Sequence, residues 1–161
     1  MATWPTVTND DGSGTTGTIL DQTLFNSIRD YIGAAWTSVT FNAGNFTASG
    51  SMTWTVASGD VNTFDYVEIG KTMIVSCVLS TTTVGGTPST ALKITIPNGR
   101  TAGNLSSGPV IGLNNGSQFN GFWQVNGGTV IDLYVDATAG TNWTASTNNT
   151  QIRLLATFEI A

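Results

Sequence analysis

Hydrophobic and polar positions alternate with a period of two along most of the chain after Trp36. This alternation is typical of β-strands that bury one face. The alternating runs lie near residues 36–41, 51–57, 61–69, 72–80, 91–96, 109–113, 117–125, 129–135 and 151–160. Eight or nine short strands in one domain predict an all-β fold, a jelly-roll-like antiparallel β-sandwich over residues 35–161.

Turn residues separate these runs at close intervals. Asn and Gly tolerate the positive φ angles that tight hairpins require. The clearest predicted hairpin is Asn126-Gly127-Gly128, which lies between two apolar runs. Further turns are predicted at Gly85-Gly86, Asn98-Gly99, Asn115-Gly116 and Asn120-Gly121.

The first 34 residues follow different patterns. Residues 1–18 are rich in Thr, Asn, Asp and Gly, so we expect an extended N-terminal arm. Residues 19–34 predict one short amphipathic α-helix from about Asp21 to Ile32, with Asp21 as N-cap and Gly33 just beyond its end. Its predicted apolar face consists of Leu24, Ile28, Tyr31 and Ile32.

The last predicted strand carries apolar residues on both faces. Ile152, Leu154 and Phe158 share one face, and Leu155 lies on the other. Either the strand is central in the sheet or another subunit covers its second face. Together with the apolar helix face, this predicts a homo-oligomer, for which we expect a trimer.

Charge patterning argues against several kinds of partner. Charged residues make up 9% of the chain and the net charge is −5. The five cationic residues are scattered, whereas a phosphate backbone requires clustered Lys and Arg, so we expect no nucleic-acid partner. We also expect no membrane partner and a soluble protein made in a cytoplasm, because neither a signal peptide nor an apolar run of membrane-spanning length is evident.

The candidate catalytic chemistry is sparse. The chain has no histidine, which removes the usual general base and the commonest transition-metal ligand. Asp132 and Asp136 could share a face and serve hydrolysis or calcium binding, but solvated outward positions explain them more simply. The segment Asn9-Asp10-Asp11-Gly12-Ser13 lacks the bidentate Glu of a calcium loop. We therefore expect no enzyme activity, no metal and no cofactor.

The cysteine and the tryptophans suggest where buried positions and contact positions lie. Cys77 is the only cysteine, and its alternating context predicts a buried thiol. Trp54 and Trp123 lie in strand patterns and are predicted to be core residues. Trp4, in the arm, and Trp143, in a predicted loop, have no local core to enter, so they join the helix face as interface or ligand candidates.

Several segments carry a resemblance to a known class of proteins. They are Asp10-Asp11-Gly12-Ser13-Gly14-Thr15-Thr16-Gly17-Thr18, Phe41-Asn42-Ala43-Gly44-Asn45-Phe46-Thr47, Met52-Thr53-Trp54-Thr55-Val56 and Gly70-Lys71-Thr72-Met73. An arm, one short helix and a Thr-, Gly- and Asn-rich β-domain resemble the small virion structural proteins of tailed bacteriophages. The resemblance implies a location in the virion after assembly in the host cytoplasm, and a trimer.

Two functions are compatible with that resemblance. A capsid decoration or cement protein on the outer surface of a phage head needs a compact oligomer and an arm that contacts the major capsid protein or other virion proteins. A tail fibre or receptor-binding module needs loops that contact host surface glycans. The first is favoured because no repetitive shaft is present. A third reading, a free-standing lectin, leaves the arm and helix unexplained.

Overall fold

The computed structural model describes residues 35–161, which form ten β-strands and three short 3-10 helices. The strands are β1 (Thr37–Ser38), β2 (Phe46–Ala48), β3 (Met52–Thr55), β4 (Val61–Ile69), β5 (Thr72–Gly86), β6 (Ala91–Thr95), β7 (Leu105–Asn114), β8 (Ser117–Asn126), β9 (Val130–Tyr134) and β10 (Ser146–Glu159). The 3-10 helices are η1 (Ala43–Asn45), η2 (Ser58–Asp60) and η3 (Pro97–Gly99). The described part of the chain is therefore all-β, as predicted.

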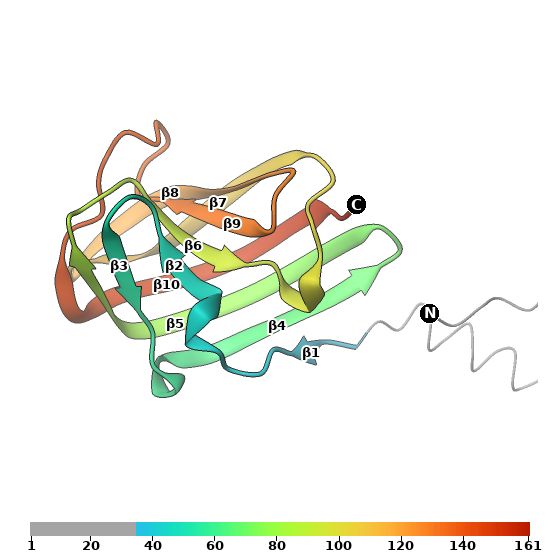
Figure 1. The fold of residues 1–161 in the computed structure, drawn as a ribbon, viewed down its shortest axis with the longest axis horizontal. Coiled ribbons are helices and arrows are strands. Elements are labelled where there is room, and N and C mark those ends of the chain that lie inside the picture. Colours follow the sequence, from blue (N-terminus) through green and yellow to red (C-terminus); the bar gives the residue numbers. More distant parts are fainter. Residues whose placement is uncertain (1–34) are drawn as a thin grey trace, which may run out of the picture. The chain divides into compact units, whose positions relative to one another are not determined.

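The strands form one curled antiparallel sheet (Figure 1). Its order is β1-β4-β5-β10-β7-β8-β9-β6-β2, and β3 pairs with β5 beside this path. Strands β7, β8 and β9 follow one another through hairpins, and β10 returns after a longer connection to lie beside β7. The spatial order β10-β7-β8-β9 is that of a Greek key.

The inner side of the curled sheet holds a single hydrophobic cluster. Strand β5 contributes Met73, Val75, Cys77 and Leu79 to it, and all four are at most 1% exposed. Each fully buried aliphatic side chain of this kind stabilises the fold by about 1.5–3 kcal/mol. Because β5 pairs with β3, β4 and β10, it joins three strands around the same core.

Most predicted strands are present, with shifted ends. The run at 61–69 coincides with β4, and the run at 72–80 is the first part of a longer strand that continues to Gly86. The run at 36–41 shrinks to the two residues of β1. Strand β2 was not predicted, because three residues are too few for alternation to be recognised.

The predicted hairpin at Asn126-Gly127-Gly128 and the predicted turn at Asn115-Gly116 are confirmed. The first joins β8 to β9. In the second, Asn115 and Gly116 have φ angles of 49° and 78° and join β7 to β8, as expected of a two-residue hairpin turn.

The turn predicted at Asn120-Gly121 is wrong, because both residues lie inside β8. A Cβ atom on Gly121 would lie 1.8 Å from the carbonyl oxygen of Tyr134. The glycine at this position therefore permits a close approach of two backbones rather than a reversal of the chain.

The predicted arm (1–18) and the predicted helix (Asp21–Ile32) lie outside the described residues, together with the contact candidates Trp4, Leu24, Ile28, Tyr31 and Ile32. No helix within residues 35–161 has the length and apolar character needed to cross a membrane.

Candidate functional site

Trp143 belongs to the core, and the prediction that it has no local core to enter is wrong. Its side chain is fully buried, its ring lies edge-on to Phe119 with centroids 5.0 Å apart, and its indole Nε1 donates a hydrogen bond to the carbonyl oxygen of Leu133 at 3.1 Å. Its backbone N–H donates to the carbonyl oxygen of Ser89. The loop before β10 therefore folds inward, and Trp143 is not available as a contact residue.

The two other tryptophans predicted to be core residues are buried. Trp54 is 5% exposed, and its indole donates to the hydroxyl of Thr82 at 3.0 Å. Trp123 is 4% exposed and lies against Gly108, where an added Cβ would be 2.8 Å from the indole nitrogen. These indoles support the core and leave no tryptophan to form a binding platform in β3 or β8.

Asp132 and Asp136 each interact with their own neighbours. The Nζ atom of Lys93 lies 3.0 Å from Oδ1 of Asp132, within ion-pair distance although outside hydrogen-bonding geometry. Asp136 accepts hydrogen bonds from the backbone N–H and the hydroxyl of Thr138, both at 2.8 Å. Hydrogen bonds from Thr141 and Thr138 lower the pKa of Asp136 to about 2. The second carboxylate therefore serves to shape its own loop.

The remaining candidates are a metal site and the thiol of Cys77. Within residues 35–161, no three His, Cys, Asp or Glu side chains gather as a metal site would require. Cys77 is fully buried as predicted, and burial raises the pKa of its thiol to about 12. A thiol with so high a pKa is protonated at neutral pH and is a poor nucleophile.

The surface that stands out is the side of β7, β8, β9 and β10 that faces away from the core, here called the outer face. Its residues are Pro109, Ile111, Leu113, Gln118, Asn120, Phe122, Gln124, Asp132, Tyr134, Gln151, Arg153 and Leu155. Leu155 is 62% exposed and Ile111 is 46% exposed. Ile111 pairs with Arg153, so Leu155, two residues further along β10, lies diagonally across from it.

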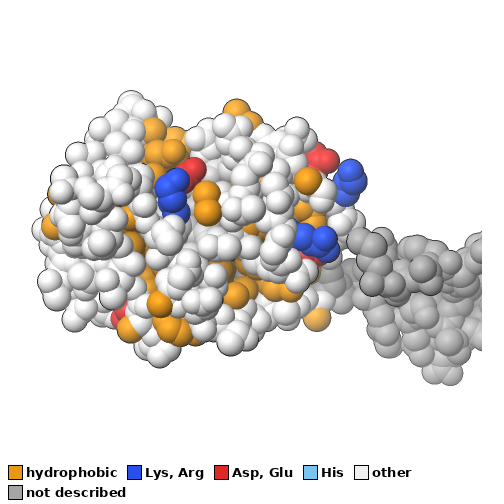
Figure 2. Space-filling view, viewed as in Figure 1, with side chains coloured by type: hydrophobic (Ala, Val, Ile, Leu, Met, Phe, Trp, Pro, Cys, Tyr) orange, Lys and Arg blue, Asp and Glu red, His pale blue; other side chains and the backbone are white. Residues whose placement is uncertain are grey.

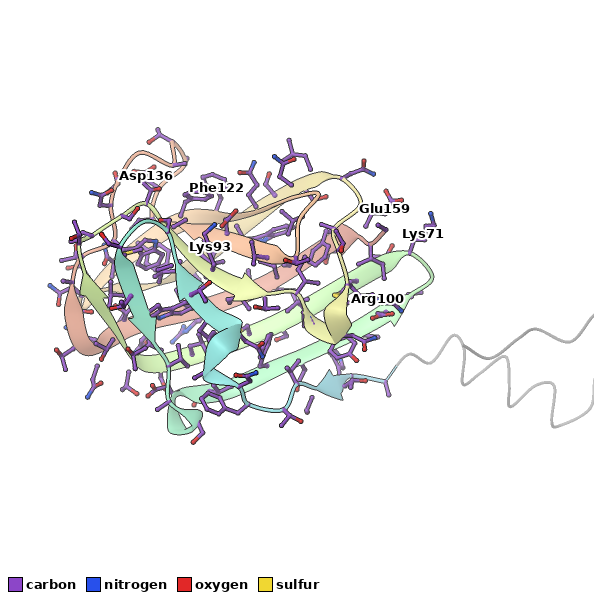
Figure 3. The ribbon with its side chains drawn as sticks, viewed as in Figure 1. Lys71, Lys93, Arg100, Phe122, Asp136 and Glu159 are labelled. Carbon is purple, nitrogen blue, oxygen red and sulfur yellow. The ribbon has the colours of Figure 1, made fainter. Side chains whose placement is uncertain are left out.

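An aromatic pair continues the outer face across β8 and β9. Phe122 and Tyr134 are opposite each other in the register, and their rings stack with centroids 4.8 Å apart. Phe122 is labelled in Figure 3. Pro109 of β7 is opposite Phe122 on the other side. Desolvation raises the pKa of the Tyr134 hydroxyl, and the charge of Asp132 adds to the effect. The outer face thus combines aliphatic, aromatic and polar side chains.

A shallow hollow of about 340 Å³ opens on the outer face near the β7–β8 turn. It is lined by Ile111, Gly112, Leu113, Gln118, Phe119, Asn120, Gln151 and Arg153. A Cβ on Gly112 would lie 2.0 Å from the carbonyl oxygen of Gln151 and 3.0 Å from the ring of Phe119. The missing side chain lets β7 approach β10 closely, and this brings the three strands together at the hollow.

The described cations divide into two that are paired with carboxylates and two that are not. Figure 2 shows a mostly uncharged surface with a few separate charged side chains. Of the four cations in residues 35–161, Lys93 pairs with Asp132 and Arg100 pairs with Glu68, whereas no described carboxylate lies within ion-pair distance of Lys71. No described carboxylate lies within ion-pair distance of Arg153, which lines the hollow.

Sequence reasoning did not identify the hollow or the aromatic pair. The hollow is formed by residues of β7, β8 and β10, and the aromatic pair by residues of β8 and β9. Only the pairing register of these strands brings the residues together. One sequence signal pointed toward this surface, namely the apolar Leu155 on the second face of the last strand. Strand β10 lies between β5 and β7 in the sheet, so it is central. Leu155 on its second face is still exposed to solvent in the described structure.

Comparisons with protein-family models, curated proteins and solved structures find no match to this chain. The fold and the outer face therefore carry the functional argument.

Proposed function

We propose that this chain is a non-enzymatic structural protein of a virus particle, a capsid decoration protein on the outside of a phage head. The observation that supports it best is the exposure of Leu155 and Ile111 on the two central strands β10 and β7. Apolar side chains at the middle of a sheet, next to a stacked aromatic pair, are the kind of surface that associates with another protein.

The partner proposed for this surface is a second copy of the chain, within a homotrimer. Burying one Leu and one Ile side chain at each contact is worth a few kcal/mol, which is enough to favour association when other contacts add to it. The Greek key β10-β7-β8-β9 supports the jelly-roll-like class proposed for the domain, since a jelly roll contains such keys. The phage assignment itself rests on the resemblance of the sequence segments.

Electron microscopy of purified particles tests the location. Labelled full-length protein added to particles that lack it should cover the head in a regular array. The variant Trp4→Ala should reduce this binding without lowering the melting temperature of the protein, because the arm is the proposed attachment segment. Label confined to one vertex or to the tail would contradict the decoration function.

A second candidate function, a tail fibre or receptor-binding module that contacts host glycans, is supported by the hollow on the outer face. Amide side chains beside an apolar floor can recognise hydroxyl groups and the apolar face of a sugar ring. The particle-mapping experiment separates the two candidates, because a fibre-tip protein would appear only at the tail.

A further inference from the structure

The hollow between β7, β8 and β10 has the composition of a small-ligand site. Its volume of about 340 Å³ lies at the lower end of the range of ligand pockets, which begins at about 300 Å³. Ile111 and Leu113 give it apolar walls, and Gln118, Asn120 and Gln151 add three amides. A site of this size and openness accommodates one or two sugar rings rather than a long chain.

Within residues 35–161, the amides of the hollow have no side-chain hydrogen-bond partner. No hydrogen bond joins the amides of Gln118, Asn120 or Gln151 to another described side chain, whereas Asn114 and Asn149 at the nearby turn bond to Thr144 and Asn115. Amides that have both donors and acceptors free can each bond to a sugar hydroxyl in either direction. The hollow therefore suits a ligand rich in hydroxyl groups.

Arg153 gives the hollow a preference for a negatively charged ligand. Among the described residues, its guanidinium is the only cationic group that lines the hollow, and none of the described carboxylates pairs with it. Guanidinium binds a carboxylate through two parallel hydrogen bonds, which suits a single negative charge. A polyphosphate would require several cations, which the hollow lacks.

We propose that the hollow binds an acidic saccharide, with the sugar carboxylate on Arg153 and the sugar hydroxyls on Gln118, Asn120 and Gln151. This inference rests on the second candidate function and competes with the contact proposed between copies, because Ile111 belongs both to the hollow and to that contact. If it fails, the decoration function is unaffected, because that function is tested on particles and this one on the isolated protein.

The test is a titration of the ¹⁵N-labelled full-length protein, followed by the side-chain amide signals in NMR spectra. The probes are N-acetylneuraminic acid and a short oligomer of galacturonic acid, each compared with its methyl ester, which keeps the ring and removes the charge. We expect the acids to shift the side-chain amide signals of Gln118, Asn120 and Gln151, and the esters to bind at least about tenfold more weakly.

Two charge variants provide the matched comparison. Arg153→Gln should weaken binding of the acids by about tenfold or more, because it removes a charge-assisted contact. Lys71→Gln removes the same charge at the β4–β5 turn and should leave affinity unchanged (Lys71 is labelled in Figure 3). Arg153 is opposite Val78, and Lys71 lies seven residues or about 23 Å from Val78 along β5. Unchanged melting temperatures and spectral dispersion would show that both variants fold.

Several results would overturn the proposal. They are an absence of shifts at millimolar acid, equal binding of acid and ester, and equal binding by Arg153→Gln and the unchanged protein. Tighter binding of inorganic phosphate or of an acidic peptide would also overturn it, because the ligand would then be of another class. If Arg153→Gln increases self-association and leaves sugar binding intact, the guanidinium acts to keep the outer face soluble, and the proposal fails.

Discussion

At the scale of single residues, three glycines allow the outer strands to pack closely. Gly108 leaves room for the indole of Trp123. Gly112 and Gly121 leave room for the backbone carbonyl groups of Gln151 and Tyr134 respectively. None of the three has a positive φ angle, so each is required for space rather than for an unusual backbone conformation.

The variant Gly121→Ala should be strongly destabilised, because its Cβ would lie 1.8 Å from the carbonyl oxygen of Tyr134. We expect the free energy of unfolding in urea to fall by about 3 kcal/mol or more. Gly128→Ala is the matched control, since no atom lies within 4 Å of its added Cβ, and it should change the free energy of unfolding by less than about 1 kcal/mol. Equal effects would contradict the close approach of β8 and β9.

Asp136 predicts a specific acid sensitivity. Its pKa is lowered to about 2 in the folded protein, from an ordinary value of 3.8, by hydrogen bonds from Thr141 and Thr138. A lowered folded-state pKa stabilises the protein above pH 3.8, and this contribution is lost as the pH falls from 3.8 to about 2. Melting temperatures measured from pH 5 to pH 2, in steps of about half a pH unit, should therefore fall more steeply for the unchanged protein than for Asp136→Asn. Parallel curves for the two proteins would refute this role.

Single residues also show what the sequence can and cannot predict. Burial of Cys77, Trp54 and Trp123 was predictable, because each lies in an alternating run. Burial of Trp143 was not, because its partners Phe119 and Leu133 lie on other strands and no local pattern connects them to it. Gly121 was mistaken for a turn residue because a glycine needed for space has the same sequence signal as one needed for a reversal.

At the scale of elements, β10 combines two roles. Its inner residues fill the core, and its outer residues Leu155 and Arg153 lie on the outer face. The apolar pattern on both sides was visible in the sequence, and the central position of the strand was one of the two explanations offered for it. The hollow was not predictable, because its walls depend on the register of β7 against β8 and β10.

Leu155→Thr should weaken self-association with little effect on folding. It removes an apolar side chain that is 62% exposed, so the association constant should fall by about tenfold if a second copy covers it. The melting temperature should change little, because an exposed strand position tolerates Thr.

Analytical ultracentrifugation of the Leu155→Thr protein measures the effect on association. Leu105→Thr is the control, because Leu105 is equally exposed at 62% but lies at the start of β7, away from the centre of the outer face. If both variants associate as the unchanged protein does, the outer face is not the contact between copies.

At the scale of the whole molecule, the core is a single unit around β5. This strand pairs with three others, and its thiol at Cys77 is fully buried. Local opening at a turn or an edge strand would leave this thiol covered. Access to it therefore reports on unfolding of the entire β-domain.

Labelling of Cys77 by a thiol reagent should be slow under native conditions and should follow the global free energy of unfolding. We expect the labelling rate, measured at increasing urea concentration, to rise in parallel with unfolding observed by tryptophan fluorescence. The raised pKa of about 12 slows the reaction further until the strand is exposed to solvent. Fast labelling in the absence of urea would indicate that β5 opens independently.

The position of β10 between β5 and β7 also has a consequence for the order of events during synthesis. Of the described strands, β10 leaves the ribosome last. Its pairing with β5 joins residues that are far apart in the sequence, such as Phe158 and Met73. A nascent chain that ends before Ser146 can form the β4–β5 and β7–β8 hairpins but lacks the strand that lies between β5 and β7 in the sheet. The domain must therefore close late, through pairings that are distant in sequence, and such closure is slow. Until then the apolar edges of both halves are exposed to the crowded cell, so chaperone binding and aggregation compete with folding at this one step.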